Sequence, residues 1–183
     1  MTSDVQTWLK TDGEIYLKDI GIKKDQSILD FGCGKGHYTI PAAKIVGKKG
    51  LVYAQDKEKE ALDKVIKKAK AEGLKNIKAM KTKGELKIDL NDKSLDAVLL
   101  YDVLHYHDLE ERRKIYAEVY RILKKGALLS VFPRHHQEYM HLKLDEVKKE
   151  IEKSNFRLEG KLLKRLMHDD DYVKDHVLNF RKR

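Results

Sequence analysis

Three alternate glycines mark the stretch best suited to holding a ligand, Ile28-Leu29-Asp30-Phe31-Gly32-Cys33-Gly34-Lys35-Gly36. Glycines at this spacing permit a tight turn and let a ligand lie against bare backbone. A helix that begins after such a loop also presents free amide donors. The dinucleotide fingerprint G-x-G-x-x-G would place its third glycine at position 37, where the sequence has a histidine. The loop therefore predicts a ligand other than a dinucleotide; a plain strand-to-helix turn is the alternative.

Two carboxylates border this loop in the predicted structure. Asp30 comes two residues before the first glycine, and Asp56 ends the next apolar run, Val52-Tyr53-Ala54-Gln55-Asp56. A carboxylate at position 30 would repel a pyrophosphate but would suit an ammonium group. A carboxylate at position 56 can accept both hydroxyls of a ribose, or it can cap the helix that follows it. The pair favours a ligand with an ammonium group and a ribose.

The other side chains that could take part in chemistry are seven histidines and the single cysteine. The histidines follow expected strands or bracket the acidic run Asp169 to Asp171: they are His105, His107, His135, His136, His141, His168 and His176. None of them has an established metal-ligand spacing on a predicted helix, so we expect no metal. Tyr101, His105 or His135 could act as a general base, although each also fits a packing or lid role. Cys33 could be a reactive thiol, but we expect only a small side chain in a crowded turn.

The elements that must position these residues alternate along the chain. Short apolar runs predict strands at 27–31, 51–55, 77–80, 95–101 and 127–132. Apolar residues at helical spacing predict helices at 4–20, 37–46, 58–72 and 109–124, and Leu144, Val147 and Ile151 mark a last helix. Residues 156–180 predict a β-hairpin with a long or bulged loop. This order predicts an α/β fold, a doubly wound sheet with helices on both faces. Such sheets bind ligands beyond the carboxyl ends of their strands.

Composition limits the class of protein. The 183 residues are 41% hydrophobic and 38% charged, which fits one globular domain. We find no apolar run long enough for a membrane span and no secretory signal at the N-terminus. The single cysteine cannot form a disulfide within the chain. Because such cysteine use is typical of reducing compartments, we expect a cytoplasmic protein. The net charge of +9 invites a nucleic-acid partner. The lysines are spread along the chain, however, so solvated helix faces explain most of this excess.

The segments together resemble the class I S-adenosylmethionine-dependent methyltransferases, in particular the short relatives of the ubiquinone/menaquinone C-methyltransferase type. The matching stretches lie in order between residues 13 and 132, at 28–36, 50–56, 92–98 running into Val103-Leu104-His105, and 121–129. The resemblance implies a Rossmann-like, seven-stranded, mostly parallel sheet with an antiparallel last strand. It also implies S-adenosylmethionine as cofactor.

The resemblance assigns cofactor-binding roles to eight residues. Gly32, Cys33 and Gly34 would pack on the methionine part, with Asp30 supporting its amino group directly or through the loop. Asp56 would hold the ribose and Lys57 would flank the adenine, while Tyr101 would face the methionine end and the acceptor. Relatives carry an acid after the third strand; this sequence has Gly84 there and Glu85 next to it. Either Glu85 substitutes for that acid or only backbone contacts remain.

The expected activity is methyl transfer to an acceptor, with no catalytic residue demanded because the cofactor carries the reactive group. We expect a small-molecule acceptor; the alternatives are RNA or protein methylation, or a module that binds the cofactor without turnover.

The acceptor site should lie over strands 95–101 and 127–132, walled by Tyr101, His105, His135 and the N-terminal helix. We expect one domain, 1–183, with a helical lid at 1–20, a cofactor-binding core at 21–132, and a lid segment, last helix and hairpin at 133–183. The sequence indicates neither the identity of the acceptor nor the oligomeric state.

Overall fold

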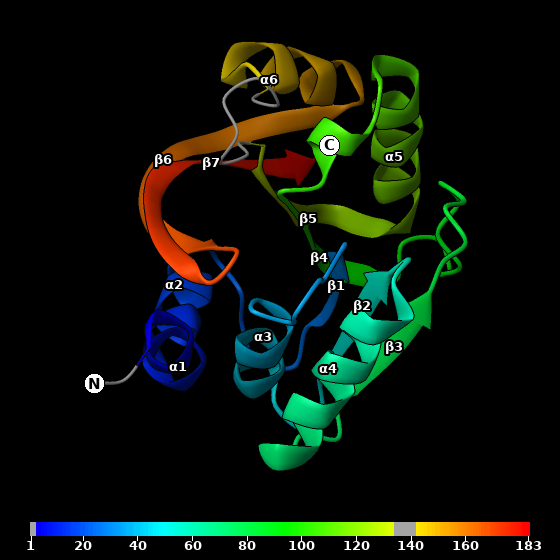
Figure 1. The fold of residues 1–183 in the computed structure, drawn as a ribbon. Helices are drawn as coiled ribbons and strands as arrows, with labels where there is room; N and C mark the ends of the chain where they lie inside the picture. Colours follow the sequence, from blue (N-terminus) through cyan, green and yellow to red (C-terminus); the bar gives the residue numbers. More distant parts are fainter. Residues whose placement is uncertain (1–2, 134–141) are drawn as a thin grey trace.

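The fold is built on one seven-stranded sheet in the order β3-β2-β1-β4-β5-β7-β6 (Figure 1). The computed structural model describes residues 3–133 and 142–183. All neighbouring strands from β3 to β5 pair in parallel, and β7 pairs antiparallel with both β5 and β6. This confirms the α/β, doubly wound, Rossmann-like sheet with an antiparallel last strand. The strands are β1 (Ser27–Phe31), β2 (Leu51–Asp56), β3 (Ile77–Lys81), β4 (Leu95–Tyr101), β5 (Leu123–Phe132), β6 (Phe156–His168) and β7 (Asp171–Lys182).

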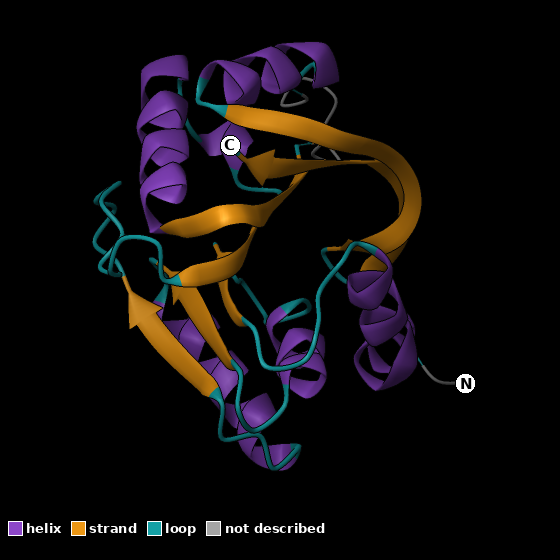
Figure 2. Ribbon diagram, turned by 180° about the vertical axis from the view of Figure 1, so that it is seen from behind, coloured by secondary structure: helices purple, strands orange, loops and turns teal. Residues whose placement is uncertain are grey.

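Helices cover both faces of the sheet (Figures 1 and 2). The alternation of side chains along β4 shows how: Val98 and Leu100 pack in one core with α5 and α6, and Ala97 and Leu99 pack in the other with α2 and α3. A strand buried on both faces needs a continuous apolar sequence, as β4 has. The helical elements are α1 (Asp4–Thr7), η1 (Trp8–Asp12), α2 (Gly13–Asp19), α3 (Thr39–Val46), α4 (Lys59–Ala71), η2 (Leu104–Tyr106), α5 (Leu109–Ile122) and α6 (Leu144–Lys153).

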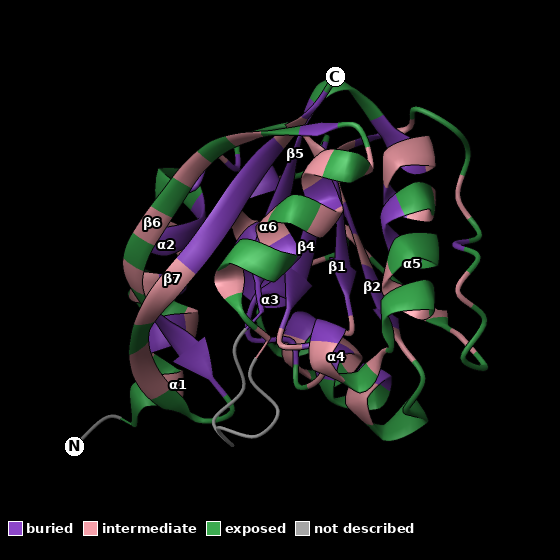
Figure 3. Ribbon diagram, turned by 90° about the horizontal axis from the view of Figure 1, so that it is seen from above, coloured by how far each residue is buried: buried purple, intermediate pink, exposed green. Residues whose placement is uncertain are grey.

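The burial of residues agrees with this layered arrangement: the central strands are buried, while the outward faces of α4 and α5 are exposed (Figure 3). The chain runs outward from β1 to β3 and then returns to β4 on the other side of β1. Loops that leave the carboxyl ends of β1 and β4 therefore diverge, which opens a crevice at that edge. No helix in the described parts of the chain is long and apolar enough to cross a membrane.

Two predicted elements, a helix and the hairpin, differ in the structure. The helix predicted to reach residue 124 ends at Ile122, because Leu123 is already extended and pairs with Leu95 in the sheet. The hairpin has no long loop: His168 pairs with Asp171, so its turn is only two residues long. The irregularity lies instead in the strands, where the register shifts between Leu158 and Gly160.

The N-terminal segment is also interrupted, because a π-helical turn, Trp8–Asp12, separates α1 from α2. Its side chains anchor it to the body of the protein. The Trp8 indole is 1% exposed and donates a hydrogen bond of 2.7 Å to the His37 carbonyl. Gly13 lies so close to α3 that an added Cβ would be 2.6 Å from Cγ of Pro41. The segment predicted to be a lid is therefore packed tightly against α3.

Candidate functional site

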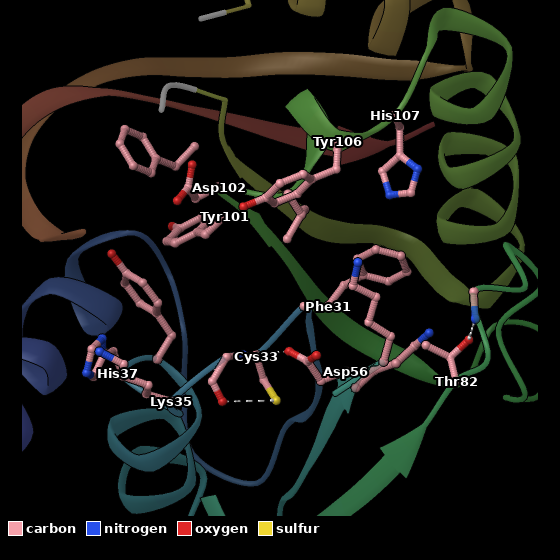
Figure 4. A pocket seen from close by; sticks show the side chains of 18 of the residues that line it. Phe31, Cys33, Lys35, His37, Asp56, Thr82, Tyr101, Asp102, Tyr106 and His107 are labelled. Atoms are coloured by element: carbon pink, nitrogen blue, oxygen red, sulfur yellow. Dashed lines mark hydrogen bonds between the residues drawn. The ribbon is translucent and has the colours of Figure 1, made fainter. Parts of the chain in front are cut away.

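A cavity of about 550 Å³ opens at the carboxyl ends of β1, β2 and β4. This volume lies within the range of about 300–1,000 Å³ that small-molecule sites occupy. Seven of the eight predicted cofactor residues line it, among them Cys33, Asp56 and Tyr101 (Figure 4). The end of β6 and the hairpin turn that follows it complete its wall. The lining residues come from six segments: Phe31 to Lys35 with His37 and Tyr38; Gln55 to Lys57; Thr82 and Gly84 to Leu86; Tyr101 to Val103 with Tyr106, His107 and Glu111; Phe132; and Met167 to Asp169.

The glycine loop after β1 forms the floor of the cavity. Gly32 and Gly34 have φ angles of 73° and 49°, a region that side chains disfavour. An added Cβ at Gly32 would be 2.3 Å from Val103, whereas at Gly34 it would meet nothing within 4 Å. The amides of Gly32 and Cys33 both donate to the Gln55 carbonyl, at 2.8 and 2.9 Å. The loop is thus fixed from beneath, while its backbone at Gly34 stays open to a ligand.

Cys33 lies in this loop with its side chain buried. Burial, together with the nearby charges of Asp30 and Asp56, raises the pKa of its thiol well above the usual value. A thiol in such surroundings stays protonated and is a poor nucleophile. This environment fits the small packing side chain that we expected at Cys33.

Asp56 ties the ends of β1 and β2 together. Its Oδ2 accepts a hydrogen bond of 2.9 Å from the Gly34 amide, and its Oδ1 accepts one of 2.9 Å from the Glu58 amide. A carboxylate has about four lone-pair positions, so each oxygen can accept a further donor from the cavity. The structure therefore gives Asp56 a loop-fixing role and leaves it able to bind ligand hydroxyls.

Asp30 lies behind the loop and is outside the cavity lining. Its carboxylate is 3% exposed and accepts a hydrogen bond of 2.5 Å from the Thr39 hydroxyl at the start of α3. Burial raises the pKa of Asp30 to about 6, against the opposite effect of Thr39. Of the two roles we expected for Asp30, the geometry favours support through the loop over direct contact.

The opposite end of the cavity is bordered by Gln55, Lys57 and the turn at residues 82–86. Glu85 is exposed, and its Oε2 accepts hydrogen bonds from the Lys83 amide at 2.8 Å and the Thr82 hydroxyl at 3.2 Å, which shapes this turn. Those backbone and hydroxyl contacts lower the pKa of Glu85.

Gln55, which sequence reasoning missed, has a buried Oε1 with no hydrogen-bond partner in the described chain. A buried acceptor of this kind indicates a position for a ligand donor.

Tyr101 stands at the end of β4 with its hydroxyl held inside the protein. Ser130 Oγ donates to Asn179 Oδ1 at 2.7 Å, so it accepts from the Tyr101 hydroxyl at 2.7 Å. The Tyr101 oxygen in turn accepts from the Tyr16 hydroxyl at 2.7 Å. Burial raises the pKa of Tyr101 well above its usual value. This network makes Tyr101 a rigid part of the wall and disfavours it as a general base.

Only part of the wall that we predicted for an acceptor lies at this cavity. Tyr101 lines the cavity; His105, whose side chain is 1% exposed, and α1, η1 and α2 do not. His135 lies outside the described residues, as do His136, His141 and most of the expected lid segment. The hairpin supplies what the prediction lacked, through Met167, His168 and Asp169. The histidine-acid run at the hairpin turn was the sequence signal for this wall, but we considered it only as a metal site and rejected it as one. Within the described ranges, no group of three or more His, Cys, Asp or Glu is placed to hold a metal ion.

The hairpin turn is attached to the glycine loop. Asp170 forms an ion pair of 2.5 Å with Lys35, and its Oδ1 lies 3.5 Å from Nε2 of His37. The Tyr38 hydroxyl donates a hydrogen bond of 2.5 Å to the Met167 carbonyl. Burial lowers the pKa of His37 to about 4, so this imidazole is neutral at neutral pH. These contacts hold the hairpin over the cavity.

Known proteins share both the sequence pattern and the fold. A family model described as a methyltransferase domain matches residues 22–175. A demethylmenaquinone methyltransferase from Staphylococcus aureus is 27% identical and aligns over 90% of this chain and 75% of its own length. A probable cobalt-precorrin-6B C(15)-methyltransferase (decarboxylating) from Saccharolobus solfataricus is 28% identical over 64% of this chain, which spans 57% of that relative's length.

The structural comparison covers nearly the whole chain. The crystal structure of a SAM-dependent methyltransferase from Aquifex aeolicus superposes with a TM-score of 0.77, at 26% identity, over 97% of this chain and 92% of the other. The family match extends from just before β1 into β7, so it includes every strand that borders the cavity. The chain therefore belongs to the S-adenosylmethionine-dependent methyltransferases.

Proposed function

We propose that this protein transfers a methyl group from S-adenosylmethionine to a small-molecule acceptor bound under the β6–β7 hairpin. The observation that carries the proposal is one continuous cavity that runs from the glycine loop and Asp56 to a wall of apolar and aromatic side chains. The first part offers polar groups for a cofactor, and the second offers a mostly apolar enclosure. Relatives named for menaquinone and precorrin chemistry act on small molecules, which agrees with this division.

The residues present fit the cofactor. Open backbone at Gly34 can accept the methionine part, and the remaining lone pairs of Asp56 can accept the ribose hydroxyls. The buried Oε1 of Gln55 and the turn at residues 82–86 offer contacts at the adenine end, beside Lys57. Cys33 and Tyr101 would close the methionine end, with Asp30 holding α3 and the loop in place. The group supplies an activated methyl on a sulfonium, which needs no further activation by the protein.

The protein's own contribution is alignment and exclusion of water. A sulfonium methyl reacts quickly only when the nucleophile is held in line with it, and orientation of this kind is worth several kcal/mol. Tyr38, Tyr101, Phe132 and Met167 give the acceptor side of the cavity its apolar surface. The tyrosine network and the hairpin attachment keep this surface rigid, which favours one acceptor pose.

The test is methyl transfer from labelled S-adenosylmethionine into a cell extract separated into small molecules, RNA and protein. We expect label in the small-molecule fraction, and loss of that label with Asp56→Ala. Asp63→Ala, which removes an exposed acid on α4, is the control. Label confined to RNA would overturn the proposed acceptor class. It would direct attention to residues 57–87, a basic stretch with eleven lysines and five acids. Label confined to protein would overturn it as well. Absence of both cofactor binding and transfer would overturn the proposal as a whole.

A further inference from the structure

Asp102 has an unusual backbone conformation at the edge of the cavity. It follows β4 directly and has a φ angle of 55°, which a residue with a side chain adopts infrequently. Its amide donates a hydrogen bond of 2.9 Å to the Phe132 carbonyl, which keeps this conformation in place. Asp and Asn adopt this conformation more readily than other residues with side chains, and residues held in it cluster at functional sites. Asp102, Tyr101 and Tyr106 lie across the cavity from Cys33 and Asp56 (Figure 4).

The Asp102 carboxylate lies between two imidazoles from different elements. Its Oδ2 is 3.1 Å from Nδ1 of His168 at the end of β6, and its Oδ1 is 3.4 Å from Nδ1 of His105 in η2. Of these two histidines, only His168 lines the cavity. An imidazole whose Nδ1 donates to a carboxylate carries its proton there, so Nε2 becomes its basic nitrogen. This arrangement of acid and imidazole orients a general base in many enzymes.

The surroundings of His168 favour a proton on its ring. The hydrogen bond to Asp102 raises the pKa of His168, against the opposing effect of burial. The second carboxylate beside it is that of Asp169, whose Oδ2 lies 3.9 Å from Nε2. His105, Tyr106 and Tyr38 are further titratable groups that interact with Asp102. The Phe132 ring packs edge-on against the imidazole, with centroids 6.0 Å apart. Two acids can therefore stabilise an imidazolium that forms in an apolar wall.

We propose that His168, oriented by Asp102, is the general base that takes the proton from a hydroxyl of an aromatic acceptor. This inference rests on the proposed methyl transfer and adds the acceptor class. The proton of the phenolic hydroxyl passes to Nε2 of His168, and an electron pair of the resulting phenolate forms the bond to the methyl carbon. The electron pair of the former carbon–sulfur bond stays on sulfur, which leaves S-adenosylhomocysteine and a protonated His168. Asp102 is a positioning residue in this scheme.

The acceptor class follows from the wall around the imidazole. Tyr38, Tyr101, Tyr106, Phe132 and Met167 line the same cavity as His168 and give it a wall that suits a flat aromatic ring. A phenol with a pKa of about 10, as in tyrosine, is mostly un-ionised at neutral pH and gains from a base. An imidazole is well suited to this task because its pKa lies near the working pH.

The first experiment needs no activity. Titration of the histidine ring signals by NMR in the protein without added ligand, with His168→Gln to assign the resonance, measures the pKa of His168. We expect this pKa to lie above the usual value of about 6.5 for histidine and to fall by about one pH unit or more in Asp102→Asn. A pKa for His168 that does not change in Asp102→Asn would overturn the pairing.

The second experiment uses phenols of graded acidity: phenol, 4-chlorophenol and 4-nitrophenol. Single-turnover methyl transfer should fall about 100-fold or more in His168→Gln with phenol and far less with 4-nitrophenol, which is largely ionised without help. Asp102→Asn should show the same dependence on acidity, and His176→Gln should match the unaltered protein. In the unaltered protein the rate with phenol should fall as the pH drops through the pKa of His168, because an imidazolium cannot accept the proton.

The outcomes separate this inference from the proposed function. An equal loss for all three phenols in His168→Gln would indicate a structural role and overturn the general base. Binding of S-adenosylhomocysteine without transfer to any of the phenols would overturn the acceptor class. Failure to bind S-adenosylhomocysteine at all would instead contradict the proposed function. Calorimetry on His168→Gln should show unchanged cofactor binding, since His168 lies on the acceptor side.

Discussion

Alanine substitution at two glycines of the same loop should separate stability from ligand binding. At Gly32 the new Cβ would lie 2.3 Å from Cγ1 of Val103, at a φ angle of 73°. The left-handed conformation costs a residue with a side chain about 1–2 kcal/mol, and overpacking in a tight core costs about 1–3 kcal/mol more. We expect Gly32→Ala to lower the free energy of unfolding by about 2–5 kcal/mol.

Gly34 is the matched control because its φ angle of 49° is similar and its Cβ would meet nothing within 4 Å. Gly34→Ala should cost only the conformational part, about 1–2 kcal/mol. Its methyl group would point into space that the proposed cofactor occupies. We therefore expect Gly34→Ala to bind S-adenosylhomocysteine more weakly than its modest loss of stability would suggest.

Urea unfolding followed by circular dichroism measures both effects, and a double-mutant cycle tests the cause. Val103→Ala removes the atom that Gly32→Ala would strike, so the double variant should recover about 1–3 kcal/mol relative to the sum of the single changes. Equal losses for Gly32→Ala and Gly34→Ala, with no coupling to Val103, would refute the steric argument.

Three further substitutions test the buried polar groups. Because burial raises the pKa of Asp30 from 3.8 to about 6, the folded protein binds a proton that the unfolded chain releases, and the free energy of unfolding should decline as the pH rises between about 4 and 6. Asp30→Asn should reduce that decline by up to about 3 kcal/mol, which urea unfolding at several pH values would measure. An unaltered pH dependence would contradict the raised pKa of Asp30. Ser130→Ala removes the hydroxyl that joins Tyr101 to Asn179 and should lower the free energy of unfolding by about 1–3 kcal/mol; a neutral effect would mean that the network contributes nothing. Glu150 accepts two hydrogen bonds, of 2.9 and 2.8 Å, from the half-buried Arg112. Glu150→Ala removes this partner and should lower the free energy of unfolding by about 3 kcal/mol or more. Asp63→Ala, which breaks the exposed pair with Lys59, should lower it far less.

Much of the fold could be predicted because the local signals agree with the tertiary structure. The apolar run at residues 95–101 gave the bounds of β4, and Gly73, with a φ angle of 65°, ends α4 as a terminating glycine should. The end of α5 could not be found in this way. Leu123 continues the helical spacing of apolar residues, but its pairing with Leu95 in the sheet outweighs that local preference.

The position of the glycine loop and Asp56 at the cavity could also be predicted, because these residues lie in short motifs next to strand ends. Gly32, Gly34 and Asp56 are placed by the strands that precede them. The acceptor side depends on contacts between distant segments. His168 reaches Asp102 across 66 positions of sequence because the hairpin curves back over the sheet (Figure 2). No local pattern records that curvature, so the sequence did not indicate that these two residues meet.

Calorimetry with S-adenosylhomocysteine and with NAD⁺ tests the central claim most directly. The loop after β1 has His37 in place of a third fingerprint glycine, and Asp56 at the cavity keeps lone pairs that can accept ribose hydroxyls. We predict saturable, one-to-one binding of S-adenosylhomocysteine, weakened by about 1–3 kcal/mol in Asp56→Ala, and no measurable binding of NAD⁺. Tight binding of NAD⁺ with no binding of S-adenosylhomocysteine would contradict the account.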